Sequence, residues 1–128
     1  MKSLAYTKSS KQSFETVAAN LEKNSADNQF RVLAIHNVQE TLAEKGFEYG
    51  PLTIIEVCNA GFAHQALQKD VDVAMFMPCK FTVYTENDKT MVTLARPTMI
   101  ADLLPGRGLE KLAQSVETTL MNVLVDSI

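Results

Sequence analysis

Residues 81–95 read Phe-Thr-Val-Tyr-Thr-Glu-Asn-Asp-Lys-Thr-Met-Val-Thr-Leu-Ala and carry the clearest fold signal in the chain. Two runs rich in β-branched, aromatic and apolar residues, 81–85 and 91–95, flank the polar segment 86–89. Asn and Asp favour turns because their side chains bond the nearby backbone and tolerate left-handed conformations. The stretch therefore predicts an antiparallel hairpin late in the chain.

Upstream of the hairpin, three further strands alternate with helical patterns. Residues 3–8 alternate weakly, with Leu4 and Tyr6 on one side, and residues 30–36 form a stronger strand pattern. Residues 52–58 are apolar on both sides, which is typical of a strand inside a sheet.

The predicted helices have recognisable starts and apolar stripes. Ser9 and Gln12 match a capping box and predict a first helix there, with a stripe of Phe14, Val17, Ala18 and Leu21. Asn59 is a suitable N-cap for a helix over 61–69, with Phe62, Ala66 and Leu67 facing inward. Shorter helices are expected over 38–45 and 97–104. A long last helix carries Leu109, Leu112, Val116, Leu120, Val123 and Leu124 on one stripe.

The element order is β-α-β-α-β-α-β-β-α, ending on the hairpin and the long helix. This order predicts an α+β sandwich, in which helices pack on a mixed or antiparallel sheet. A doubly wound α/β domain is the alternative. It is disfavoured because the strands are few and no Gly-rich turn joins a strand to a helix.

Composition sets broad limits on partners. The chain has 128 residues, 46% hydrophobic and 21% charged, which excludes collagen-like, low-complexity and disordered classes. Because a domain has roughly 150 residues, we expect one domain over 1–128. The 12 Lys and Arg residues against 15 Asp and Glu give a net charge of −3. Without a basic excess, nucleic acid is not an expected partner.

The chain start and the cysteine count bear on the compartment. Residues 1–8 lack the apolar centre of a signal peptide. The longest apolar run, 73–79, is far shorter than the roughly 20 residues that span a bilayer. Two cysteines, Cys58 and Cys79, are too few for a small disulfide scaffold. We therefore expect no membrane partner and a cytoplasmic protein with two reduced thiols.

Two motifs carry a family resemblance. One is Glu56-Val57-Cys58-Asn59, followed by an Ala-rich helix, and the other is Met77-Pro78-Cys79-Lys80-Phe81-Thr82-Val83-Tyr84. Together they resemble DUF302, a bacterial and archaeal family of unknown function, and the resemblance covers nearly the whole chain. Members commonly show Val-Cys-Asn-Pro and Leu-Pro-Cys, where this chain has Ala60 for the proline and Met77 for the leucine. The resemblance implies a compact α+β domain, often a dimer, and implies no catalytic residue.

The two cysteines are the first candidates for chemistry, because each lies at the end of a predicted strand. Cys58 precedes the 61–69 helix, where the helix dipole would lower the pKa of a thiol and favour the reactive thiolate. That placement fits a redox or nucleophilic role. The alternative, which free cysteines usually follow, is that both are small buried apolar side chains.

A metal site is a second possibility. Cys58, His64 and Cys79, with His36 as a further candidate, offer ligands for zinc or copper. The spacing Cys58-x5-His64 is not that of a standard zinc site. The alternative that His64 is an ordinary surface or core residue therefore stays open.

Glu56 shares a strand face with Cys58, since side chains alternate with a period of two. A buried carboxylate is costly unless it is paired, so Glu56 beside the thiol or His36 would make an acid–base pair. The alternative is a solvated edge position, or a pairing with Lys80 or Arg31.

Two other groups of residues are weaker candidates. Arg96 and Arg107 lie in loops before predicted helices. Either they bind an anion there, or they are ordinary solvated loop residues. Four methionines close together in the sequence either form an adaptable contact surface or fill the core. They are Met75, Met77, Met91 and Met99.

These observations leave three functions open. The first is a ligand- or metal-binding or sensing module, with a site at Glu56, Cys58, Asn59, Pro78 and Cys79. The second is a thiol-based redox protein or enzyme that uses Cys58 or Cys79. The third is a protein-interaction module, and a homodimer is expected from the resemblance. The sequence names no cofactor and holds no Ser-His-Asp order, phosphate loop or dinucleotide fingerprint.

Overall fold

The structure, a computed structural model, describes residues 3–128, whose strands form one five-stranded sheet. The strands are β1 (Ala5–Ser10), β2 (Arg31–Asn37), β3 (Leu52–Cys58), β4 (Cys79–Glu86) and β5 (Lys89–Ala95). Their order across the sheet is β1-β5-β4-β3-β2, and every neighbouring pair is antiparallel. The expected α+β fold is confirmed, and the doubly wound alternative, which needs a parallel sheet, is wrong.

The predicted hairpin is the connection between β4 and β5. Glu86 pairs with Lys89, so that only two residues form the turn. Those residues, Asn87 and Asp88, have positive φ angles of 50° and 61°. Two left-handed residues in succession match the twist of the flanking strands, which is why Asn and Asp stand there.

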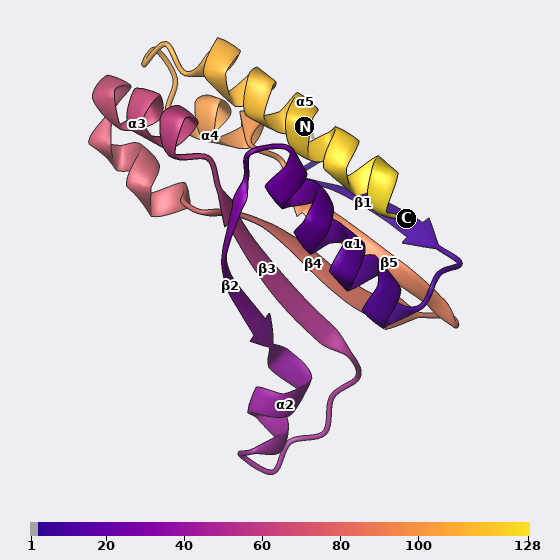
Figure 1. Ribbon diagram of the computed structural model, residues 1–128. Coiled ribbons are helices and arrows are strands. Elements are labelled where there is room, and N and C mark those ends of the chain that lie inside the picture. Colours follow the sequence, from indigo (N-terminus) through magenta and orange to yellow (C-terminus); the bar gives the residue numbers. More distant parts are fainter. Residues whose placement is uncertain (1–2) are drawn as a thin grey trace.

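The helices lie on one face and beyond both ends of the sheet (Figure 1). They are α1 (Phe14–Asp27), α2 (Val38–Ala43), α3 (Ala60–Lys69), the 3-10 helix η1 (Val71–Phe76), α4 (Thr98–Leu103) and α5 (Glu110–Ser127). Helices α1 and α5 lie against each other across the sheet, α3, η1 and α4 gather near the start of β4, and α2 extends beyond the end of β2. None of the helices in residues 3–128 is long and apolar enough to cross a membrane.

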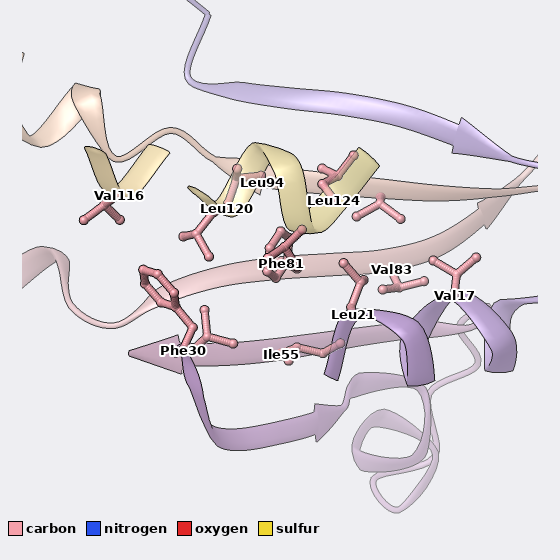
Figure 2. Packing of buried hydrophobic residues seen from close by; sticks show 13 residues of the cluster. Val17, Leu21, Phe30, Ile55, Phe81, Val83, Leu94, Val116, Leu120 and Leu124 are labelled. Carbon is pink, nitrogen blue, oxygen red and sulfur yellow. The ribbon is translucent and has the colours of Figure 1, made fainter. Parts of the chain in front are cut away.

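The main core lies between the sheet and the two long helices (Figure 2). Its fully buried members from the helices are Val17, Leu21, Leu120, Val123 and Leu124, and those from the sheet are Ile55, Val57, Phe81, Val83, Val92 and Leu94. Burying one such side chain stabilises the fold by about 2 kcal/mol before entropy is counted. A smaller cluster of Val73, Ala101, Leu104, Leu109 and Ala113 fills the end near η1 and α4.

The two faces of the sheet differ in burial. Along β3, Thr53, Ile55 and Val57 are buried, and the alternate residues between them are only partly buried. Residues opposite each other in an antiparallel pair point to the same face. Val57 lies opposite Cys79, so Cys79 is on the helix-covered face. Glu56 lies opposite Ala34 and Lys80 on the other face.

Two sequence predictions about the helices were wrong, and one short helix was not predicted. The first helix does not begin at Ser9, because β1 pairs with β5 as far as Ser10. Its N-cap is Ser13, whose Oγ accepts a hydrogen bond from the Thr16 amide at 3.1 Å. Leu67 does not face inward but is exposed, and η1 was not expected.

Candidate ligand pocket

Both cysteine motifs meet at one apolar cavity of about 70 Å³. Cys58, Asn59, Pro78 and Cys79 line it, together with apolar side chains of α3, η1, α4 and α5. The cavity lies where the two core clusters meet, since Val57 of the first and Ala113 of the second also line it. Four of the five expected ligand-binding residues are therefore brought together by the fold.

The register of β3 and β4 places the two thiols. Cys79 follows the cis Met77–Pro78 peptide bond and begins β4 opposite Val57, which is fully buried. Cys58 is the last residue of β3 and pairs with Arg31 of β2. Both cysteines are free. The end of one strand and the start of its neighbour thus bring to the same cavity two cysteines that twenty residues separate in the sequence.

Asn59 lines one side of the cavity, and both polar atoms of its side-chain amide are hydrogen bonded. Its Oδ1 accepts a hydrogen bond from the Phe62 amide at 3.0 Å and so caps α3, as the sequence predicts. Its Nδ2 donates to the backbone oxygen of Gln29 at 3.0 Å, and Gln29 has a φ of 68°. Asn59 therefore joins the loop before β2 to the start of α3, and its side chain holds the wall of the cavity.

The thiols are not activated. Burial raises the pKa of Cys58 above its ordinary value of 9.0. Burial also raises the pKa of Cys79, and with the neighbouring Cys58 it outweighs the lowering effect of Lys80 and brings the pKa to about 11. The predicted lowering at the start of α3 is wrong, because removal of the thiols from water disfavours the thiolate. At neutral pH both cavity sulfurs are protonated.

The structure does not assemble the expected metal ligands. His64 is exposed on α3 and does not line the cavity, whereas Cys58 and Cys79 do. Among residues 3–128, no three His, Cys, Asp or Glu side chains lie close enough to hold a metal ion. The cavity therefore brings together two of the three expected metal ligands, Cys58 and Cys79, without His64.

Glu56 is the expected site residue that lies apart from the cavity. It is on the sheet face that carries no helix, where its Oε2 lies 3.1 Å from His36 Nε2. The predicted pairing with His36 is therefore the one that the structure shows. Both side chains are partly exposed to solvent, so the pair is a surface contact rather than a buried acid–base couple.

The two arginines suggested as anion sites are engaged within the protein. Arg107 Nη1 lies 3.1 Å from Asp70 Oδ2. Arg96 lies over the Tyr6 ring, 4.8 Å from its centre, and its Nη2 is 3.5 Å from Glu117 Oε2.

Glu117 is a buried charge that the sequence reading did not single out. It is 3% exposed, and its carboxylate accepts hydrogen bonds from Thr98 N at 3.1 Å, Thr98 Oγ1 at 2.7 Å and Tyr6 OH at 3.3 Å. Burial alone would raise the pKa of Glu117, but the bonds from Thr98 and Arg96 outweigh it and hold the pKa below its ordinary value. The available signal was its spacing, since Glu117 stands four residues after Ala113 and three before Leu120 on the buried side of α5.

Comparison with known proteins supports the family resemblance. Residues 6–126 match the family described as "Domain of unknown function DUF302". The fold is similar to the crystal structure of an uncharacterized conserved protein DUF302 from Bacillus stearothermophilus. The TM-score is 0.92 and the identity 31%, over 98% of each chain. No curated protein matches the sequence. The chain belongs to the DUF302 family, as its two cysteine motifs and its antiparallel sheet indicated.

Proposed function

We propose that residues 1–128 form one domain that binds a small uncharged molecule in the cavity between Cys58 and Cys79. The supporting observation is the convergence of both motifs on this cavity at the junction of the two core clusters. A void lined by apolar side chains forgoes packing contacts that a well-filled core would make. A ligand that fills the void restores those contacts.

The lining and the volume limit what the cavity accepts. No charged side chain from residues 3–128 lines it, so an ion would lose its hydration there without gaining a partner. Apolar cavities of about 150 Å³ bind benzene. At about 70 Å³ the cavity takes a smaller molecule at rest. The flexible side chain of Met77 on the wall offers room for expansion.

The test compares the natural protein with a variant whose cavity is filled. Ala113→Val adds two methyl groups to the cavity wall, and Ala19→Val makes the same change at an exposed position of α1. Ligands that bind only the folded state raise the melting temperature. We expect xenon, which is smaller than benzene, to raise the Tm of the natural protein and of Ala19→Val, but not of Ala113→Val. Equal shifts in all three proteins, or no shift in any, would refute the proposal.

A thiol enzyme is the less supported alternative, because a nucleophile requires the thiolate and burial disfavours it at both cysteines. Two unpaired cysteines are typical of a reducing compartment, and we propose the cytoplasm as the location.

A homodimer is a second proposal, supported by a separate surface. β2 is an edge strand, and the arm from β2 to β3 carries exposed large apolar side chains at Leu33, Ile35, Phe47 and Tyr49. Exposed edge strands pair readily, and a two-fold dimer would use the same edge of both copies. We expect light scattering to give twice the monomer mass, and Ile35→Lys to give the monomer mass. A monomer at high concentration would refute this interface.

A further inference from the structure

A second hollow, larger than the cavity, lies on the same end of the fold. It is a groove of about 400 Å³, lined by the end of η1, the start of β4, the connection from β5 to α4, and Leu4. The segment 77–79 lines both hollows. Most small-molecule sites have volumes of roughly 300–1,000 Å³, so the groove is large enough for a complete ligand.

The groove wall is apolar and open to solvent. Met75 on its rim is 71% exposed, and Leu4 and Leu103 beside it are also exposed. Met77 and Met99 line the groove at partly buried positions. Unbranched thioether side chains adapt to ligands of varied shape. An exposed apolar surface of this kind marks a contact site such as a ligand-binding groove, and an unbranched alkyl chain is one occupant that adaptable methionine side chains accept.

The charge of the lining is positive. Lys80 and Arg96 contribute to the groove, and no Asp or Glu from residues 3–128 lines it. Lys80 is exposed and makes no ion pair within the part of the chain that the structure describes.

Arg96 is held within the protein. Its Nη atoms donate to Ser3 O, Thr98 Oγ1 and Glu117, whereas its Nε is buried without a hydrogen-bond partner. Because Glu117 offsets much of the charge of Arg96, Lys80 is the main cation open to a ligand.

We propose that this groove binds a single-chain amphiphile with a carboxylate head. The carboxylate lies at Lys80, and the alkyl chain lies along Met75, Met77 and Met99. A free carboxylate amphiphile fits better than a cationic or neutral one, because Lys80 would otherwise have no counter-ion in the groove, whereas Arg96 is already paired with Glu117. The proposal does not depend on a ligand in the inner cavity, since the two hollows differ in charge and volume.

The experiment uses decanoate, decanol and decyltrimethylammonium as probes, each below its micelle concentration. Methionine methyl groups labelled with ¹³C report the position of binding by NMR. We expect decanoate to shift Met75, Met77 and Met99 and to leave Met91 and Met121 unchanged, because those two lie outside the groove. Decanol should bind more weakly than decanoate, and decyltrimethylammonium more weakly still. Binding of decanoate should weaken as salt increases.

The decisive variant is Lys80→Gln, with Lys89→Gln as its matched control on β5. Both lysines are exposed, so neither change threatens the fold. We expect Lys80→Gln to weaken decanoate binding about tenfold, which is the effect of losing one ion pair in a partly apolar site, and to leave decanol binding unchanged. Lys89→Gln should bind both probes as the natural protein does.

Several outcomes would overturn the proposal. They are no binding of decanoate at millimolar concentration, equal binding of the cationic probe, or equal weakening by both lysine variants. Shifts of the three groove methionines on raising protein concentration alone would show instead that a second copy of the chain fills the groove. Xenon, tested on Lys80→Gln, reports on the inner cavity separately, so that failure of one proposal is distinguishable from failure of the other.

Discussion

Cys79 lies opposite fully buried Val57 in the register between β3 and β4, and this pairing puts its thiol on the helix-covered face of the sheet. Cys58, one position further along β3, ends its strand beside the same cavity. A shift of one residue in the register would turn Cys79 to the opposite face. Pairing between the strands therefore decides the environment of the Cys79 thiol. That environment sets the reactivity of the thiol and makes the stability of the fold depend on pH.

Alkylation of Cys79 in the folded protein will be slow. With a pKa of about 11, the thiolate fraction of Cys79 near pH 8 is about 100-fold below that of a thiol at 9.0. Iodoacetamide labelling of Cys58→Ser, followed by mass spectrometry, isolates Cys79, and Cys79→Ser isolates Cys58. Labelling of either cysteine as fast as in the unfolded chain at pH 8 would contradict the raised pKa values.

The same thiol makes stability depend on alkaline pH. The pKa of Cys79 is raised in the folded state, so its contribution is complete below about pH 9 and is lost as pH rises towards about 11. Two pKa units correspond to about 3 kcal/mol at most. The free energy of unfolding, measured by urea titration, should fall more steeply between pH 9 and 11 in the natural protein than in Cys79→Ala. Parallel curves for the two proteins would exclude the effect.

Glu117 will be the most sensitive charged position. Glu117→Ala leaves Arg96 and Thr98 without their shared acceptor inside the fold, and breaking such a buried pair costs about 3–5 kcal/mol. Because the pKa of Glu117 is lowered, its stabilising effect is present above about pH 4.5 and is lost as pH falls through the folded pKa. In the Glu117→Gln variant, the free energy of unfolding should not show this decrease as the pH is lowered. Glu110→Gln, at an exposed position of α5, is the control and should match the natural protein.

Asn59 will contribute more to the stability of the fold than a residue that only caps a helix. Asn59→Ala removes the acceptor for Phe62 N and the donor to Gln29 O, and we expect a loss of about 2 kcal/mol. Asn59→Asp keeps the cap but loses the donor, so its cost should be smaller. Asn37→Ala removes the cap of the short exposed helix α2 and should cost about 1 kcal/mol or less. If Asn59→Ala costs no more than Asn37→Ala, the bond to Gln29 contributes nothing.

The pair of His36 and Glu56 will contribute little. The His36 side chain is 52% exposed and the Glu56 side chain 23%, and ion pairs in such surroundings are worth up to about 1 kcal/mol. A double-mutant cycle of His36→Gln and Glu56→Gln should give a coupling energy below about 1 kcal/mol at pH 6. A larger value would restore the pair as a candidate for acid–base chemistry.

The parts of the fold that could be predicted from sequence are those set by neighbours along the chain. The turn at Asn87 and Asp88, the cap at Asn59 and the buried stripe of α5 follow from backbone preferences and from helical or strand periodicity. The start of α1 could not be predicted, because pairing of β1 with β5, eighty residues away, extends the strand over Ser9. A local capping pattern yields when long-range strand pairing supplies the backbone hydrogen bonds instead.

The candidate site also has features that depend on neighbours along the chain and features that depend on the tertiary structure. The sequence by itself determined that Cys58 and Cys79 stand at strand ends, since that depends on residues within a few positions. Only the tertiary structure decided that both line one cavity, that His64 stays outside it, and that Glu117 meets Arg96 in the interior. The physical reason is that strand order and helix placement depend on how all apolar stripes are buried together. A local pattern records which face of an element is apolar, but it does not record what that face will meet.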